Sequence, residues 1–179
     1  MLLLQETMQE KELIITRTAI ARRIKELGAA ITQDYADTGI LVVGILKGAF
    51  VFLADLVREI RLDMEIDFAR AVSYGKQTQS RNLRLTKEPE LELAGKDILI
   101  VEDIVDTGKT LAHLSQLLSN RGARSVRFCA LIDKKERREV DVVIDYIGFE
   151  VQTGFLVGYG LDCREQYRQL PDIYHLKNV

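Results

Sequence analysis

The stretch from Ile98 to Leu111 reads Ile-Leu-Ile-Val-Glu-Asp-Ile-Val-Asp-Thr-Gly-Lys-Thr-Leu. Residues 98–101 are wholly apolar and rich in β-branched side chains, a pattern typical of a parallel strand that is covered on both faces. The chain then becomes charged, so we expect Glu102 and Asp103 at the carboxyl end of this strand, where open α/β sheets bind their ligands. A helix should follow the polar turn. Its expected apolar stripe is Leu111, Leu114, Leu117 and Leu118.

The charged half of this stretch combines two features that suit a sugar phosphate. The adjacent carboxylates of Glu102 and Asp103 can accept hydrogen bonds from vicinal hydroxyls or hold a divalent cation through water. The small residues from Asp106 to Thr110 can cradle a phosphate where a helix begins. The simpler interpretation is a solvated acidic corner in an ordinary strand–loop–helix unit. A Walker A loop is excluded, because that motif needs a glycine five residues before Gly108, where this chain has Asp103.

A second unit of buried strand, polar turn and helix precedes the first. Residues 40–46 form the strand, Lys47-Gly48 the turn, and residues 49–60 the helix. Because parallel strands end at the same sheet edge, Lys47 and Gly48 should lie beside Glu102 and Asp103. The side chains of the helix that we expect to point inward are Phe50, Leu53, Leu56 and Val57. The other expected elements are a helix from an N-cap at Thr16 to Tyr35, a strand within 65–74, a polar loop over 75–88, a strand over 125–132 and a last core strand over 142–147.

Composition limits the classes of function. The chain has 179 residues, which suits one domain with a proper core, and its net charge of -2 offers no general attraction to nucleic acid or to an anionic membrane. Cys129 and Cys163 are too few for a disulfide framework or a zinc site, so we interpret both as packed thiols in a reducing compartment. The chain start lacks the basic and apolar pattern of a signal peptide, and no segment is long and apolar enough to span a membrane. We therefore expect a cytoplasmic protein.

The segment from Val101 to Thr110 resembles the phosphoribosyl-pyrophosphate motif of the type I phosphoribosyltransferases. Its Val-Glu-Asp-Ile-Val-Asp-Thr-Gly form is similar to the hypoxanthine-guanine branch, and the similarity can be followed from about Leu41 to Leu170. The resemblance implies an α/β fold, with a parallel sheet flanked by helices and a small cap, or hood, formed from the chain ends. The expected division is a single domain over residues 1–179, with its core at about 36–148 and its hood from about 1–35 and 149–179.

The activity that this resemblance implies is purine salvage. The 5-phosphoribosyl group of 5-phosphoribosyl 1-pyrophosphate would pass to N9 of hypoxanthine or guanine, with Mg²⁺, giving IMP or GMP and pyrophosphate. Asp106 would be the catalytic base that accepts the proton from purine N7. The residues implied for the ribose and the 5′-phosphate are Glu102, Asp103, Asp106, Thr107, Gly108, Lys109 and Thr110.

The resemblance carries the other ligand groups to further positions. Pyrophosphate is assigned to Lys47, Gly48 and Arg168, in a turn that can contain a cis peptide bond before the lysine. The purine is assigned to Lys134 at its exocyclic oxygen, to Phe155 by stacking, to the backbone of Leu156 and to Asp162. The metal is assigned to Glu102, Asp103 and Asp162, and the mobile active-site loop would start at Ser73 and Tyr74. A slack surface hairpin is the simpler interpretation of that loop.

Two alternatives stay open at this stage. A binding module that senses the sugar pyrophosphate and binds nucleic acid is disfavoured, because no DNA-binding segment or basic face is visible in the sequence. An enzyme of the same fold that acts on another base, such as xanthine, is not distinguished by the sequence. The resemblance also implies a homodimer or a homotetramer.

Overall fold

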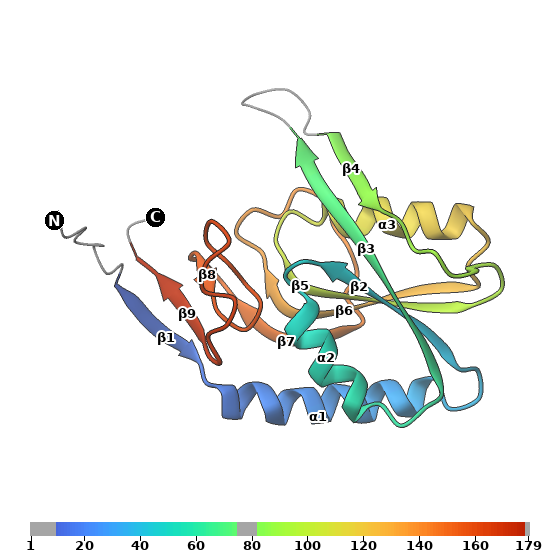
Figure 1. Cartoon of the computed structure of the whole chain (residues 1–179), viewed down its shortest axis with the longest axis horizontal. Coiled ribbons are helices and arrows are strands. Elements are labelled where there is room, and N and C mark those ends of the chain that lie inside the picture. The colour runs from blue at the N-terminus through green and yellow to red at the C-terminus, as the bar shows by residue number, and fades with distance from the viewer. Residues whose placement is uncertain (1–9, 75–81, 178–179) are drawn as a thin grey trace, which may run out of the picture.

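A computed structural model describes residues 10–74 and 82–177, which form two sheets and three helices (Figure 1). In chain order the elements are β1 (Lys11–Ile15), α1 (Arg17–Asp34), β2 (Ile40–Leu46), α2 (Phe50–Glu59), β3 (Met64–Tyr74), β4 (Asn82–Lys87), β5 (Asp97–Val105), α3 (Lys109–Asn120), β6 (Ser125–Lys134), β7 (Tyr146–Val151), β8 (Leu156–Val157) and β9 (Ile173–Leu176). The larger sheet has the order β4-β3-β2-β5-β6-β7 and is parallel except for β4. The carboxyl ends of β2, β5 and β6 therefore lie at one edge.

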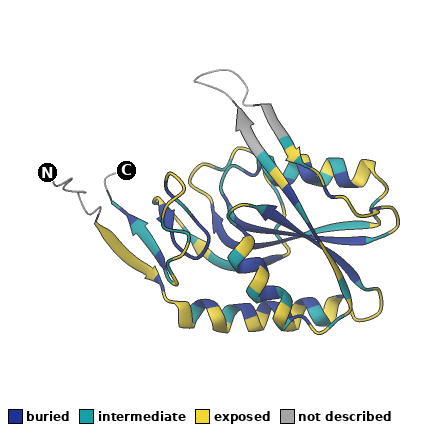
Figure 2. Cartoon of the chain, in the orientation of Figure 1, coloured by how far each residue is buried: buried dark blue, intermediate teal, exposed yellow. Residues whose placement is uncertain are grey.

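Helices cover both faces of the larger sheet. Alternate residues of its central strands point to opposite sides, so both faces are apolar and each packs against helices. Val42 and Leu99 belong to the core cluster beneath α1 and α2, whereas Val43 and Ile100 belong to the cluster beneath α3. The central strands β2, β5 and β6 are accordingly buried along most of their length, whereas exposed residues lie on the outer faces of the helices, in the loops and on β1 (Figure 2). This agrees with the expected α/β sheet. No helix in the described ranges is both long enough and apolar enough to cross a bilayer.

The two ends of the chain meet in the smaller sheet, whose order is β1-β9-β8. Lys11 pairs with Leu176, and Leu156 pairs with His175. This sheet lies beside the larger one at the end of the molecule where α1 begins (Figure 1). The predicted hood, from 1–35 and 149–179, includes α1 and part of β7. In the structure α1 packs against α2, and β7 belongs to the larger sheet. The division into this hood and a core at 36–148 stays a prediction.

Several local predictions are confirmed by the structure. The strand over 40–46 has the expected bounds, and the Thr16 side chain caps α1 by accepting a hydrogen bond from the Ala19 N–H at 3.2 Å. Cys129 and Cys163 are both buried and unpaired.

The strands of the larger sheet reach further than predicted. Glu102 and Asp103 lie within β5, which continues to Val105, and Lys134 lies in β6 and not in the turn after it. The ladder continues because neighbouring strands supply partners, as where Val105 pairs with Asp133. The prediction of a last core strand over 142–147 was wrong, because β7 occupies Tyr146–Val151. The apolar residues before it pack against the core on the α3 side as an irregular segment.

Three further predictions are corrected. Residues 82–87 are not loop but strand β4, which pairs with β3 in an antiparallel hairpin, while residues 75–81 lie outside the described part of the chain. Phe50 does not point inward but is 45% exposed, because the buried face of α2 contains Phe52, Leu53 and Leu56 at helical spacing. Leu117 is only partly buried, since it lies at the margin of the stripe on α3.

A buried carboxylate, that of Asp97, lies at the opposite edge of the larger sheet, where β5 and β6 begin. Asp97 accepts hydrogen bonds from the Arg124 Nε at 3.0 Å and from the Ser125 hydroxyl at 2.6 Å. The hydrogen bond from Arg124 is the main reason that the pKa of Asp97 lies well below its ordinary range. The charged form of Asp97 thus stabilises the fold.

Replacing Asp97 with Asn should lower the free energy of unfolding at pH 7 by about 1–2 kcal/mol, because an ion pair with a half-exposed arginine is lost. The unfolded carboxyl has the higher pKa, so the wild-type advantage should be complete above about pH 5 and shrink as the pH falls through the unfolded pKa. Urea unfolding at several pH values measures this. Exposed Asp63 provides the control as Asp63→Asn, and a wild-type advantage that does not shrink in acid would contradict the role of Asp97.

Candidate active site

The acidic pair lies buried at the carboxyl edge of the larger sheet. Burial raises the pKa of both Glu102 and Asp103, and the charge of Asp103 raises that of Glu102 further. The Asp103 carboxylate lies directly against the turn after β2, since a Cβ atom at Gly48 would come within 1.7 Å of its Oδ2. The structure therefore brings the acidic pair and the Lys47-Gly48 turn together, as the sequence predicted, and only glycine leaves room at position 48.

A segment of the chain end reaches the same turn. The peptide bond before Lys47 is cis, as the resemblance allowed, and the Lys47 Nζ lies 3.0 Å from the Glu165 Oε2. Arg168 reaches the same Glu165 oxygen at 3.2 Å. A Cβ atom at Gly160 would come within 2.2 Å of the Gly48 carbonyl oxygen. Two cations predicted to bind pyrophosphate are thus held beside one carboxylate.

Asp162 belongs to the same network as Glu165 and Arg168. Its Oδ1 lies 2.8 Å from the Arg168 guanidinium, and its Oδ2 accepts a hydrogen bond from the Glu165 N–H at 2.8 Å. No group of three or more potential metal ligands occurs among residues 10–74 and 82–177. The donors that fit Mg²⁺ are the carboxylates of Glu102 and Asp103, because hard oxygen ligands suit this ion and a cation would relieve the repulsion between them. The assignment of Asp162 to the metal stays a prediction.

The loop after β5 forms an anion site at the start of a helix. Gly108 has a φ of 81° and, as the N-cap of α3, has no side chain that could cap the helix. The Lys109 N–H donates to the Thr107 hydroxyl at 3.4 Å, and the N–H groups that follow it in the first turn have no partner within the helix and can donate to a phosphate. A cavity of about 210 Å³ opens here, lined by residues 102–108, 110 and 111. Lys109 lines no part of this cavity, since its ammonium pairs with Glu139.

Asp106 has one carboxylate oxygen paired and one unpaired. The Arg137 guanidinium pairs with Oδ2, whereas Oδ1 is buried and has no hydrogen-bond partner in the described part of the chain. Its backbone carbonyl accepts a hydrogen bond from the Arg138 Nε at 2.9 Å. A buried acceptor without a donor can take a proton from a ligand.

Two of the residues predicted to bind the purine, Lys134 and Leu156, lie in the strands β6 and β8, and Phe155 directly precedes the second of these strands. Lys134 is the buried last residue of β6, and its Nζ lies 3.0 Å from the Glu136 carboxylate. This hydrogen bond is the main cause of the lowered pKa of Glu136, to which the Gly154 N–H contributes. Phe155, which follows Gly154 in the chain, is 40% exposed, and Leu156 is buried in β8. Glu136 therefore connects Lys134 to the segment Gly154-Phe155, in which the Phe155 ring is partly exposed.

The predicted start of the mobile loop is described only in its backbone. Ser73 and Tyr74 end β3 and pair with Leu83 and Asn82 of β4. Their side chains and residues 75–81 lie outside the described residues. Closure of this loop over the site stays a prediction.

The sequence analysis missed the residues that connect the parts of the site. Glu165 was not singled out, although its position three residues before Arg168 could have indicated a local ion pair. Arg137 and Arg138 were not singled out, because their partner Asp106 lies about thirty residues earlier in the chain. Contacts at that separation leave no periodic pattern in a sequence.

Comparison with known proteins agrees with this geometry. Residues 13–164 match the phosphoribosyl transferase domain family. The hypoxanthine phosphoribosyltransferase of Escherichia coli strain K12 is 44% identical over 165 residues, which are 90% of this chain and 93% of the relative. The hypoxanthine-guanine phosphoribosyltransferase of Dictyostelium discoideum is 45% identical over 172 residues, which are 93% and 96% of the two chains. A crystal structure of a hypoxanthine phosphoribosyltransferase from Staphylococcus aureus superposes with a TM-score of 0.89 at 41% identity, covering 93% of this chain and 91% of the other.

Proposed function

The chain belongs to the phosphoribosyltransferase family, in its hypoxanthine-guanine branch, and we propose that its site transfers the 5-phosphoribosyl group of 5-phosphoribosyl 1-pyrophosphate to N9 of hypoxanthine or guanine. The products are IMP or GMP and pyrophosphate, so the enzyme serves purine salvage. The observation that carries the proposal is one cavity whose lining combines a buried acidic pair, an aspartate with one carboxylate oxygen that has no hydrogen-bond partner among the described residues, and the start of a helix whose N-cap is Gly108. Each of these suits one part of the two substrates.

The sugar pyrophosphate would lie along the sheet edge. Its ribose hydroxyls would donate to Glu102 and Asp103, and its 5′-phosphate would accept hydrogen bonds from the backbone N–H groups of residues 107–110. Its pyrophosphate would lie between the Lys47 turn and Arg168. The position of the pyrophosphate is supported by one observation: the Lys47 ammonium and the Arg168 guanidinium both lie within 3.2 Å of the same Glu165 carboxylate oxygen.

The transfer itself needs a base and a stabilised leaving group. In the reaction the bond from purine N9 to the ribose C1 forms, the bond from C1 to pyrophosphate breaks, and the N7 proton passes to Asp106. The acidic pair would stabilise the positive charge that develops on the ribose. The cations at Lys47 and Arg168 would stabilise the charge on the departing pyrophosphate.

We propose Mg²⁺ as the metal of this reaction, held by Glu102 and Asp103. The ion would supply a positive charge that stabilises the pyrophosphate oxygens as the bond to the ribose breaks. The buried, mutually repelling carboxylates support this assignment.

The setting of the enzyme is also a proposal. We propose a cytoplasmic enzyme that works as a homodimer or a homotetramer, without nucleic acid or membrane partners. The net charge of -2 supports the absence of a general nucleic-acid partner. A study of the Trypanosoma cruzi hypoxanthine phosphoribosyl transferase, which is 33% identical to this chain, concerns the oligomeric state and activity of that relative. Sedimentation velocity would measure the state of this chain.

A product assay tests the proposed function. The purified protein is incubated with 5-phosphoribosyl 1-pyrophosphate, Mg²⁺ and one of hypoxanthine, guanine, xanthine or adenine, and the nucleotides are separated by chromatography. Formation of IMP and GMP is the expected result. Formation of XMP as the main product would favour a xanthine enzyme, and the absence of any nucleotide would contradict the proposal.

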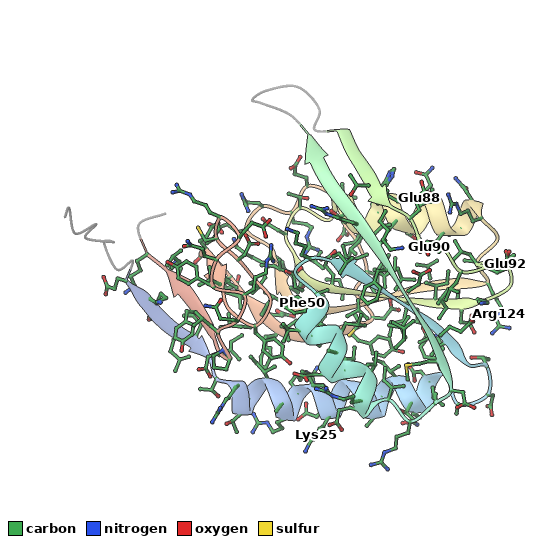
Figure 3. All side chains as sticks on the ribbon, viewed as in Figure 1. Lys25, Phe50, Glu88, Glu90, Glu92 and Arg124 are labelled. Atoms are coloured by element: carbon green, nitrogen blue, oxygen red, sulfur yellow. The ribbon has the colours of Figure 1, made fainter. Side chains whose placement is uncertain are left out.

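Changing Glu102 to Gln and Asp103 to Asn together should weaken binding of 5-phosphoribosyl 1-pyrophosphate with Mg²⁺ by about 10- to 100-fold, because charge-assisted hydrogen bonds and the metal ligands are lost. The fold should survive, since the amides keep the shapes of the side chains. Titration calorimetry measures the affinity, and circular dichroism checks the fold. The control pair is Glu90→Gln with Glu92→Gln, at exposed positions after β4 (Figure 3). Unchanged affinity in a folded variant would show that the acidic pair does not bind the sugar pyrophosphate or its metal.

A further inference from the structure

Arg138 lies in the connection between β6 and β7, and its side chain is only 15% exposed. The guanidinium contacts the ends of two neighbouring strands. Its Nε donates to the Asp106 carbonyl oxygen at 2.9 Å, and its Nη2 donates to the Val105 carbonyl oxygen at 3.1 Å. Nη2 also pairs with the Asp133 carboxylate and lies 3.4 Å from the Lys134 carbonyl oxygen. One side chain therefore joins the end of β5 to the end of β6.

The partner of Arg138 on β6 is itself fixed. Asp133 is 3% exposed and lies in the ladder between β5 and β7, where it pairs with Val105 and Glu150. A planar guanidinium that contacts a carboxylate and three carbonyl groups at once has little freedom to move. Arg138 is thus anchored on the end of β6 and reaches across to the loop that carries Asp106.

The same connection holds the phosphate loop by its main chain. The N–H groups of Glu139 and Val140 both donate to the Thr107 carbonyl oxygen at 3.0 Å. A Cβ atom at Gly108 would come within 2.3 Å of the Val140 carbonyl oxygen. The hydrogen bonds to Thr107 come from the main chain and not from the Arg138 side chain, so this support of the phosphate loop remains when that side chain is removed.

We propose that Arg138 is a positioning residue for the transfer reaction. Its guanidinium, anchored on Asp133, sets the backbone of Asp106 relative to Lys134, and so sets the base relative to the group that recognises the purine. The inference rests on the proposed function, in which Asp106 takes the N7 proton and Lys134 contacts the oxygen at position 6. Both groups contact one small rigid base, so their separation must match the distance between those atoms. A misplacement of about 1 Å in such a geometry can lower a rate by about 100-fold.

Arg137, the neighbouring residue, does not offer the same support. Its side chain is 64% exposed and contacts only the carboxylate of Asp106, not its backbone. Exposed ion pairs of this kind are weak and leave the position of the loop unchanged. The buried guanidinium of Arg138 is the group that can fix the backbone of Val105 and Asp106, because it donates to both of their carbonyl oxygens.

The test compares Arg138→Lys and Arg138→Ala with Arg124→Lys. Arg124 also binds a buried aspartate through its Nε and Nη2, but it lies at the end of the molecule away from the smaller sheet (Figure 3). Both Arg138 variants should lower kcat by about 10- to 100-fold while the KM for 5-phosphoribosyl 1-pyrophosphate changes by less than about 3-fold, because the phosphate loop stays supported. Arg124→Lys should leave both constants unchanged. A loss confined to KM, or no loss at all, would overturn the proposal.

A double-mutant cycle separates positioning from a general loss of stability. In an Asp106→Asn background the base is already absent, so adding Arg138→Ala should lower kcat by less than about 3-fold. A structural role that acts on the whole site would instead multiply the two losses. Full additivity would therefore overturn the proposal.

Hydrogen exchange keeps this inference distinct from the proposed function. Backbone amides of residues 104–106 should exchange faster in Arg138→Ala than in the wild-type protein, and at the wild-type rate in Arg124→Lys. A wild-type protein that forms no nucleotide would contradict the proposed function, whereas unchanged exchange of residues 104–106 in Arg138→Ala would contradict the positioning role. The two failures have different signatures.

Discussion

Replacing Asp106 with Asn should lower the turnover number for IMP formation by about 10- to 10⁴-fold, because a positioned general base acts mainly in the transition state. The structure gives this residue a buried Oδ1 without a hydrogen-bond partner among the described residues, and Asp106 is one of the residues that line the cavity. Asn keeps the shape and the contacts of the backbone but cannot accept the N7 proton. Single-turnover kinetics with saturating substrates measure the chemical step.

The affinity for 5-phosphoribosyl 1-pyrophosphate should stay close to the wild-type value in the same variant, since the loop and the acidic pair are intact. Asp141→Asn is the matched control, because Asp141 is exposed in the connection that follows β6. An unchanged chemical step would remove Asp106 from the role of base. An equal loss of affinity and turnover would make the residue structural.

Replacing Lys134 with Ala should lower the catalytic efficiency for hypoxanthine and guanine by about 10- to 100-fold, because a charge-assisted hydrogen bond to the oxygen at position 6 is lost. The lysine ammonium is a donor without acceptor capacity, and adenine presents an amino group at the same position. The wild-type enzyme should therefore disfavour adenine by roughly 10⁴-fold, since a buried donor would lack a partner. In Lys134→Ala the preference for hypoxanthine and guanine over adenine should be smaller than in the wild-type enzyme.

Competition between hypoxanthine and adenine for limiting 5-phosphoribosyl 1-pyrophosphate measures the preference directly. Lys135→Ala is the control, because the Lys135 side chain is largely exposed and pairs with carboxylates at 3.7 and 3.8 Å. Stacking on Phe155 should persist in both variants, so purine binding should be weakened and not abolished. Efficient AMP formation by the wild-type protein, or the same ranking of bases in Lys134→Ala, would show that Lys134 is not the selector.

Local pattern was sufficient for the elements that build the sheet edge. The apolar run at 40–46 and the polar turn at Lys47-Gly48 predicted a strand and a ligand-side turn, and the structure has both. Thr16 was predicted as an N-cap and is one. Such features depend on neighbours within a few residues, which a sequence displays directly. The resemblance to a family added the roles of the site residues, which remain proposals to be tested.

Features that depend on partners far along the chain could not be read in this way. The apolar residues before Tyr146 looked like a strand, yet β7 begins only where β6 supplies hydrogen-bond partners. Phe50 has the composition of a core residue but lies on the outer side of α2, because packing on the sheet selects the face that contains Phe52. Strand bounds and helix rotation are set by tertiary pairing.

The sequence by itself determined the alternation of strands and helices, the sheet edge at which charge gathers and the family of the chain. Only the tertiary structure decided how these charges are connected: Glu165 between Lys47 and Arg168, and Arg138 between Asp133 and the backbone of Asp106. The physical reason is that periodicity records which face of an element is buried. A hydrogen bond between residues 31 or more positions apart depends on the register of strands and the path of loops, which exist only once the chain is folded.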